Sequence, residues 1–186
     1  MSIFSDSDST VGLPDPAPAA TLLGQAPNAS LEPGHREQAS TDRSGFVAQT
    51  HPDGVVFAES AGDVAETLRL ATRHRVPVVP RGAGTGLAGG SSARSGEVVL
   101  DVSRMNKILR IDPQEQLAVV QPGVLNAQIN AAAAEYGLFY APDPASTAIC
   151  SIGGNIATNA GGMRCAKYGV TRESVLALRV ILADGR

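Results

Sequence analysis

Two glycine-rich stretches decide the fold: PVVPRGAGTGLAGG at residues 77–90 and SIGGNIATNAGGMRCAKYG at residues 151–169. The windows 82–96 and 151–169 hold 11 of the chain's 20 glycines. An ordered glycine costs backbone entropy, so two dense clusters need a structural reason. A backbone without side chains can approach a ligand closely, and successive N–H groups can surround an anion such as a pyrophosphate. We therefore predict that both stretches are loops, and that they contact one long ligand held between two lobes.

The first stretch contains a literal G-x-G-x-x-G at Gly84–Gly89, directly after a predicted strand. A Rossmann-type turn would have to open a crossover helix of about a dozen residues. Here the next strand begins at Val98, and the intervening residues have no helical period. A P-loop is also disfavoured, because no Gly-Lys-Ser/Thr follows. We predict a loop between two strands that binds an anion through its backbone, where Arg81 either adds charge or has a structural role.

The residues around this loop follow a strand–helix–strand pattern. The predicted elements are a strand at 55–58, a helix from Asp63 to about Arg75, a strand at 76–79 and a strand at 98–102. Asp63 and Glu66 predict a capping box at the start of the helix. This order is a βαβ unit with parallel strands.

The second half of the chain predicts antiparallel structure. Apolar strands at 108–111 and 117–120 flank the turn sequence DPQEQ, which predicts a hairpin. A stripe of apolar residues with helical spacing runs from Leu125 to Tyr136. An apolar run at 175–182 predicts a buried strand. We therefore predict an α+β fold, with a βαβ subdomain near 46–102 and an antiparallel-containing subdomain from about 103.

Residues 1–45 have the composition of a disordered tail. Ser, Thr, Asp, Pro, Gly and Ala dominate, and large apolar residues are few. Such a segment buries too little apolar surface to offset the entropy of ordering it. We predict a mobile tail over 1–45 and a folded domain over 46–186.

Composition excludes several classes of protein. The chain has 15 Lys+Arg and 18 Asp+Glu, so it has no broadly basic surface for nucleic acid. Two cysteines cannot form a four-thiolate zinc site. No apolar run approaches the roughly 18 residues of a transmembrane segment, and the N-terminus lacks the features of a signal peptide. We expect a cytoplasmic protein without a metal site.

Residues from about 50 onward resemble the FAD-binding domain of the vanillyl-alcohol-oxidase-type flavoproteins, which have the PCMH-type fold. Three motifs carry the resemblance, in this order: PVVPRGAGTGLAGG at 77–90, VVQPGV at 119–124 and SIGGNIATNAGGMRCAKYG at 151–169. The branch that the chain resembles most contains glycolate oxidase flavin subunits and D-lactate or D-2-hydroxyglutarate dehydrogenases.

The resemblance implies that the first loop wraps the FAD pyrophosphate and that the second stretch lines the rest of the cofactor. The implied residues are Pro80, Arg81, Gly82, Ala83, Gly84, Thr85, Gly86, Asp143, Ser146, Ser151, Ile152, Gly153, Gly154, Thr158, Asn159, Ala160 and Gly161. In several members a histidine in the first loop bonds covalently to the flavin. Thr85 occupies that position here, so we expect FAD to be non-covalent.

The resemblance also implies oxidation of a small-molecule 2-hydroxy acid by hydride transfer to the flavin. No catalytic residue can be assigned, because His35, His51 and His74 all lie outside the two stretches. Family members continue for hundreds of residues into a cap domain, so we expect an incomplete domain that is inactive alone and whose cap another chain could supply. Two alternatives stay open: a non-catalytic FAD-binding remnant or partner subunit, and a flavin reductase that uses a nicotinamide cofactor.

Overall fold

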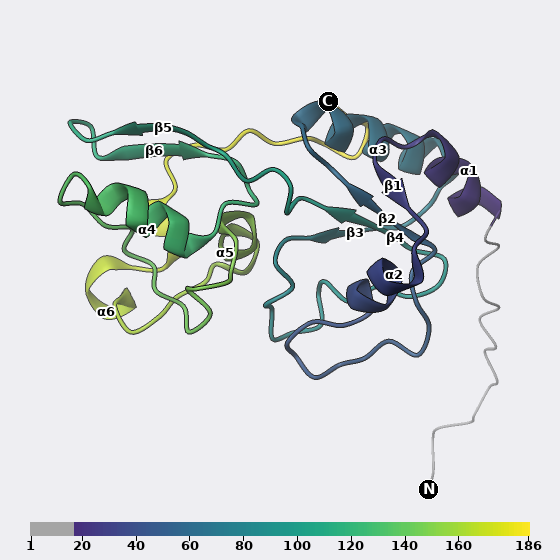
Figure 1. The fold of residues 1–186 in the computed structure, drawn as a ribbon, viewed down its shortest axis with the longest axis horizontal. Coiled ribbons are helices and arrows are strands. Elements are labelled where there is room, and N and C mark those ends of the chain that lie inside the picture. Colours follow the sequence, from purple (N-terminus) through teal and green to yellow (C-terminus); the bar gives the residue numbers. More distant parts are fainter. Residues whose placement is uncertain (1–16) are drawn as a thin grey trace, which may run out of the picture.

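Two lobes, each with its own sheet, make up residues 17–186, the part of the chain that this computed structural model describes (Figure 1). One lobe contains a four-stranded sheet with helices on both faces. The other contains a two-stranded hairpin packed on short helices. Parallel and antiparallel pairs occur in separate regions of the chain, so the predicted α+β class is confirmed.

The first sheet has the order β1-β2-β4-β3. Its strands are β1 (Ala29–Ser30), β2 (Gly54–Phe57), β3 (Val78–Arg81) and β4 (Val98–Asp101). The central strand β4 pairs parallel with both β2 and β3, and helix α3 (Ala61–His74) connects those two. The predicted βαβ unit is confirmed.

The capping box of α3 lies three residues earlier than predicted. Ser60 is the N-cap and accepts a hydrogen bond from the N–H of Asp63, whose carboxylate accepts from the N–H of Ser60. Asp63 therefore occupies the third helical position, and the pairing of Asp63 with Glu66 was wrong. Serine and aspartate are both strong N-cap residues, so the sequence pattern alone did not separate the two registers.

Each face of this sheet has its own core, because successive side chains of a strand point in opposite directions. Val56, Val98 and Leu100 pack toward α3, whereas Val55 and Val99 pack on the opposite face. All five are almost fully buried. Burying one such side chain contributes about 1.5–3 kcal/mol.

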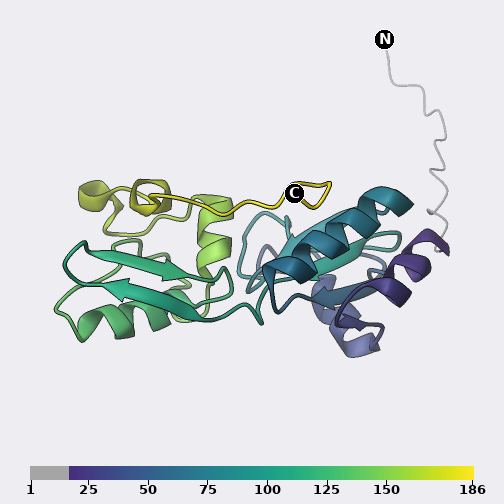
Figure 2. The same cartoon turned by 90° about the horizontal axis from the view of Figure 1, so that it is seen from above.

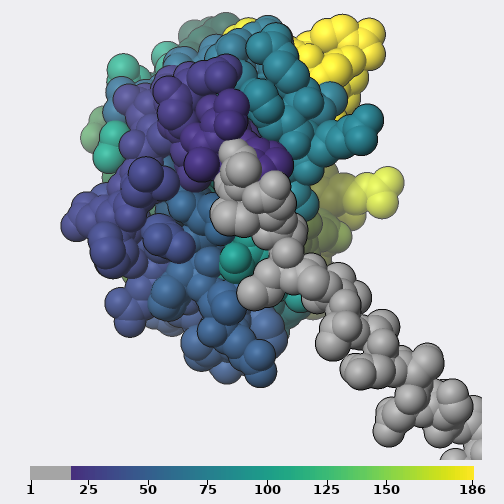
Figure 3. Space-filling model, turned by 90° about the vertical axis from the view of Figure 1, so that its right-hand side faces the viewer, coloured from purple at the N-terminus to yellow at the C-terminus, as the bar shows by residue number. Residues whose placement is uncertain are grey.

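The predicted disordered tail is wrong for residues 17–45. Helix α1 (Ala17–Gln25) lies against α3, where Figure 3 shows it in purple, and Leu22 is fully buried there. Helix α2 (Pro33–Ala39) covers the opposite face of the sheet through Ala39. A few leucines and alanines suffice to fix these helices, because the sheet provides the apolar surfaces on which they pack. Residues 1–16 of the predicted tail lie outside the described residues.

The second lobe begins with the predicted hairpin, which is confirmed. Its elements are β5 (Ile108–Asp112), β6 (Leu117–Val120), α4 (Asn126–Ala134), α5 (Ile152–Thr158), α6 (Cys165–Tyr168) and the 3-10 helix η1 (Thr171–Ser174). Val124, Ile129 and Ile152 form its buried core. The start of the second glycine-rich stretch is therefore helical, although the sequence indicated a loop.

Residues 175–182 are extended but do not form the predicted buried strand. Leu176 is 80% exposed and Val180 is 63% exposed. The segment passes from the second lobe to α3 (Figure 2), where Thr72 Oγ1 donates to the carbonyl of Ala183 at 2.6 Å. Among residues 17–186 no strand pairs with the 175–182 segment, so no neighbouring strand buries its apolar side chains.

Candidate functional site

The two glycine-rich stretches meet where the first loop touches the start of α5. Ser151 Oγ accepts hydrogen bonds from the N–H groups of Ala83 and Gly154, each at 3.3 Å. A Cβ atom on Gly82 would lie only 2.5 Å from the same hydroxyl oxygen. This contact, which we call the seam, joins the two lobes through one side chain and requires glycine at position 82.

Glycine in α5 serves close packing rather than flexibility. Ser151 caps the helix, and Ile152 at its first position is buried in the core of the second lobe. The N–H of Gly153 donates to the carbonyl of Pro122 at 2.8 Å, and a Cβ on Gly153 would lie 2.8 Å from Pro122 Cβ. The VVQPGV motif at 119–124 is thus packed against the start of α5.

The middle of the first loop has a row of backbone donors without acceptors. No described residue accepts a hydrogen bond from the N–H groups of residues 84–90, although the segments on both sides of the row are hydrogen-bonded. Gly84 and Gly89 have φ angles of +65° and +75°, which glycine adopts readily. A loop of this kind fits an anionic, oxygen-rich group such as a pyrophosphate.

Arg81 supports the loop from beneath. Its side chain is 9% exposed, and Nη1 donates to the carbonyls of Thr41 and Ser91, both at 2.9 Å. Burial lowers the pKa of this guanidinium, and the carboxylates of Asp101 and Asp42 oppose that shift. Of the two roles open for Arg81, these contacts favour the structural one.

Pro80, Thr85 and Gly86 complete the predicted first-loop set. Pro80 lies in β3, at the edge of the sheet, and is exposed. Thr85 and Gly86 lie in the row of free donors and are partly buried. The structure therefore brings Gly82 to Gly86 into one continuous loop above Arg81.

The remaining predicted residues have contacts within the second lobe. Asp143 accepts from the N–H of Arg164 at 3.0 Å, and its carboxylate lies 3.6 Å from Arg164 Nε. The carbonyl of Ser146 accepts from the N–H groups of Ile149 and Cys150, both at 2.8 Å. These contacts hold the 143–150 segment in place, and none of them reaches the first loop.

Residues 158–161 form the end of α5 and the start of the segment that leads to α6, and they contact η1. Asn159 ends the helix in a left-handed conformation, and its Oδ1 accepts from the N–H of Arg172 at 2.9 Å. The carbonyl of Ala160 accepts from the N–H and the hydroxyl of Thr171. Thr158 Oγ1 donates back to the carbonyl of Gly154, and Gly161 packs on Val170. These residues connect to the seam only through helix α5.

Several residues beside the seam were not predicted. A cavity of about 190 Å³ is lined by Ala83, Ser103, Asn106, Gly123, Leu125, Gln128 and Ser151. Asn155 in helix α5 is also buried, and its Nδ2 has no partner among the described residues. The VVQPGV motif was the one sequence signal for this region, whereas Ser103, Asn106 and Gln128 carry none. The polar side chains in the wall of the cavity fit a ligand with many acceptor atoms.

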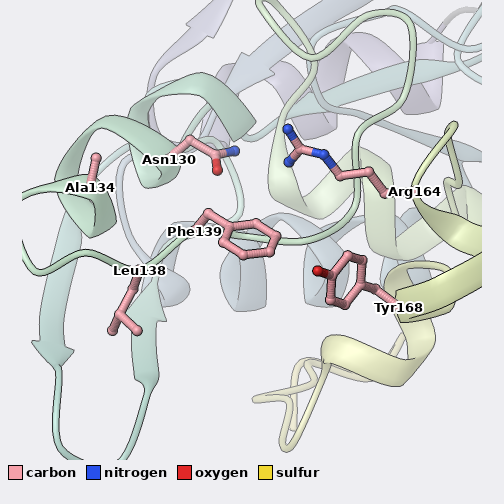
Figure 4. Close-up of a pocket in the computed structure, with 6 residues that line it drawn as sticks. All are labelled: Asn130, Ala134, Leu138, Phe139, Arg164 and Tyr168. Atoms are coloured by element: carbon pink, nitrogen blue, oxygen red, sulfur yellow. The ribbon is translucent and has the colours of Figure 1, made fainter.

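A larger cavity of about 490 Å³ lies between α4 and α6 (Figure 4). Phe139 and Tyr168 meet edge to face with ring centroids 5.5 Å apart, and the Arg164 guanidinium lies 5.3 Å from the Phe139 ring. The wall of this larger cavity contains no residue of the first loop. We assign the candidate site to the seam and the loop that adjoins it, because the free backbone donors of residues 84–90 follow Ala83 directly.

Residues 17–186 contain neither a metal-binding cluster nor a membrane-spanning helix. No group of three or more His, Cys, Asp or Glu side chains there could hold a metal ion. None of the helices in that range is both long and apolar enough to cross a membrane.

A double-mutant cycle tests the seam. We expect Ser151→Ala to lower the free energy of unfolding by about 0.5–2 kcal/mol, because it removes the helix cap and the bond to Ala83. Gly82→Ala should cost about 1–3 kcal/mol in the natural chain, because its Cβ would clash with the Ser151 hydroxyl. It should cost less in the Ser151→Ala background. Equal costs in both backgrounds, measured by chemical denaturation, would contradict the contact.

Comparison with known proteins agrees with this geometry. Residues 52–186 match the family described as FAD binding domain. The glycolate oxidase subunit GlcD of Bacillus subtilis (strain 168) is 47% identical over 137 residues, 74% of this chain and 29% of that protein. The D-lactate dehydrogenase of Anaerostipes hadrus is 38% identical over 169 residues, 91% of this chain and 34% of that protein.

Among solved structures, p-cresol methylhydroxylase with substrate bound aligns with a TM-score of 0.70 at 25% identity, over 89% of this chain and 32% of the other. The chain therefore spans about a third of the length of each of these relatives. The family match covers most of the chain and includes both glycine-rich stretches and the seam between them. The chain belongs to the FAD-binding-domain family of PCMH-type flavoproteins, and its cofactor is FAD.

Proposed function

We propose that this chain holds FAD for the oxidation of a 2-hydroxy acid. The observation that carries the proposal is the row of free N–H groups at residues 84–90, in a loop fastened on both sides. The two sequence relatives reported above are named for glycolate and D-lactate, which are both 2-hydroxy acids. The proposal extends that substrate class to this chain.

The residues have distinct roles in this proposal. The backbone of residues 84–90 binds the pyrophosphate, and each N–H that donates to a charged oxygen contributes about 1.5–3 kcal/mol. Ser151 fastens the loop to α5, and Asn155 offers a buried donor to the same ligand. Asp143, Ser146 and residues 158–161 line the remainder of the cofactor. Bound FAD supplies the hydride acceptor, and the protein binds and orients it.

A titration of the purified chain with FAD, followed by flavin fluorescence, tests the proposal. Saturable binding of FAD would support it. Bleaching of the flavin absorption band by glycolate or D-lactate, measured in the absence of oxygen, would support it further. A chain that does not bind FAD would contradict it.

A second candidate function is a cofactor-holding subunit that needs a partner chain for turnover. The relative from Bacillus subtilis is itself named a subunit. Binding of FAD without bleaching by either acid, under the same conditions, would favour this second candidate over the first.

We expect the flavin to leave the protein intact. Thr85 stands where the family members with a covalently bound flavin have a histidine, and a hydroxyl is a weaker nucleophile than an imidazole. Acid precipitation should therefore leave all flavin fluorescence in the supernatant. Fluorescence that remains with the denatured protein on a gel would contradict non-covalent binding.

A further inference from the structure

We propose that Asp42 is a positioning residue for the FAD-binding loop, acting from a clasp formed by residues 41–47. The inference rests on the proposed role of residues 84–90 in binding the pyrophosphate. Residues 41–45 of the clasp belong to the region whose sequence predicted a disordered tail, and none of the three family motifs includes the clasp. Its contacts run to the distal end of the loop, opposite the end that Ser151 holds.

The Asp42 carboxylate joins the clasp to the loop. Its Oδ1 accepts from the N–H of Ser44 at 2.9 Å, and its Oδ2 accepts from the hydroxyl of Ser91 at 3.4 Å. A Cβ on Gly86 would lie 3.8 Å from Asp42 Oδ2, so the carboxylate lies directly beside the row of free donors. Burial would raise the pKa of Asp42, but hydrogen bonds from Ser44 and Ser91 outweigh it and lower the pKa.

Arg81 connects the same two segments from below. Its Nη1 donates to Thr41 in the clasp and to Ser91 at the end of the loop. Its guanidinium also attracts the Asp42 carboxylate. One buried cation and one carboxylate thus hold the clasp and the loop end together.

The clasp is itself a closed turn. Thr41 and Val47 form an antiparallel bridge, and the hydroxyl of Ser44 accepts from the N–H of Phe46 at 3.1 Å. A Cβ on Gly89 would lie 3.7 Å from that hydroxyl oxygen, so the clasp also touches the second half of the loop. Just beyond the loop, the N–H of Ala93 donates to the carbonyl of Ala39 in α2 at 3.0 Å.

These contacts give Asp42 a positioning role and exclude a ligand role. A carboxylate repels a pyrophosphate, so Asp42 cannot strengthen binding by direct contact. Both of its oxygens are already occupied by the clasp and by Ser91. Holding the loop in its binding shape before the ligand arrives lowers the ordering cost of binding. Asp42 therefore acts on FAD affinity through the shape of the loop.

The experiment compares Asp42→Ala with the natural chain. We expect the dissociation constant for FAD to rise about tenfold, which corresponds to the loss of about two net hydrogen bonds. ADP, which carries the pyrophosphate without the flavin, should show the same rise. Asp42→Asn keeps an acceptor for the Ser44 N–H and should recover part of the affinity. Ser91→Ala, which removes only the loop-side bond, should lie between Asp42→Ala and the natural chain.

Asp112→Ala is the matched control, because Asp112 also accepts backbone N–H bonds, from Gln114 and Glu115, but at the hairpin turn. It should leave the dissociation constant unchanged. If Asp42→Ala does not fold, as judged by its thermal midpoint, Asp42→Asn and Ser91→Ala decide the question. If the folded Asp42 and Ser91 variants bind FAD and ADP as tightly as the natural chain does, the inference is overturned. The FAD site itself would still stand. Absence of FAD binding by the natural chain would overturn the proposed function and the inference with it.

Discussion

Gly84→Val is expected to weaken FAD binding by about tenfold or more. Gly84 has a φ of +65°, a conformation that would cost a β-branched residue about 1–3 kcal/mol. A Cβ there would also lie 2.4 Å from Arg81 Nη2, and the buried guanidinium has little room to move. Relief of this clash must shift the loop and displace its row of N–H donors. The measurement is a fluorescence titration with FAD.

Gly34→Val provides a control outside the loop. A Cβ on Gly34, in helix α2, would meet no atom within 4 Å, and Gly34 is not among the residues with positive φ. This variant should bind FAD with nearly the natural affinity. Equal affinity of the Gly84 and Gly34 variants would refute the assignment of this loop to the pyrophosphate.

Gly123→Ala is expected to destabilise the folded chain. Its Cβ would lie 2.4 Å from the carbonyl oxygen of Val102 and 2.8 Å from those of Ser103 and Met105. All three are backbone atoms at the connection between the lobes, so no side-chain rotation can relieve the clash. Overpacking of this kind costs about 1–3 kcal/mol. A thermal midpoint lowered by roughly 2–12 °C is the expected result, at about 2–4 °C per kcal/mol.

Gly24→Ala is the matched substitution in helix α1. Its Cβ would meet no atom within 4 Å, and alanine is favoured over glycine within a helix by about 0.5–1 kcal/mol. Its thermal midpoint should therefore rise. A Gly123→Ala midpoint equal to that of the natural chain would show that the close approach of Gly123 to residues 102–105 is not present in solution.

The sequence predicted the elements in which local pattern and burial agree. Strand β2 alternates between two buried faces, and the β5–β6 hairpin contains a turn sequence that stops both strands. The first glycine-rich loop was also recognised, because too few residues separate it from β4 for a crossover helix. In each of these cases the deciding information lies within about 20 residues.

The errors arose where distant residues decide the structure. Leu22 and Leu23 were two of the few large apolar residues in the predicted tail, but α3 and the sheet bury Leu22 completely. Gly153 and Gly154 indicated a loop, but the Ser151 cap and the contact with Pro122 make that segment a helix. The clasp at 41–47 had no sequence signal, because its role depends on Arg81 and Ser91, at least 34 residues further along the chain.

Binding of the FAD pyrophosphate by the backbone of residues 84–90 is tested most directly by nuclear magnetic resonance. The amide resonances of these residues are followed in the ¹⁵N-labelled chain during titration with FAD. Backbone N–H groups that acquire a charged acceptor change their chemical shifts strongly. The amide resonances of residues 84–90 should move in proportion to FAD occupancy, while those of residues 114–116 in the hairpin turn should not. FAD binding that leaves residues 84–90 unchanged would contradict this binding mode.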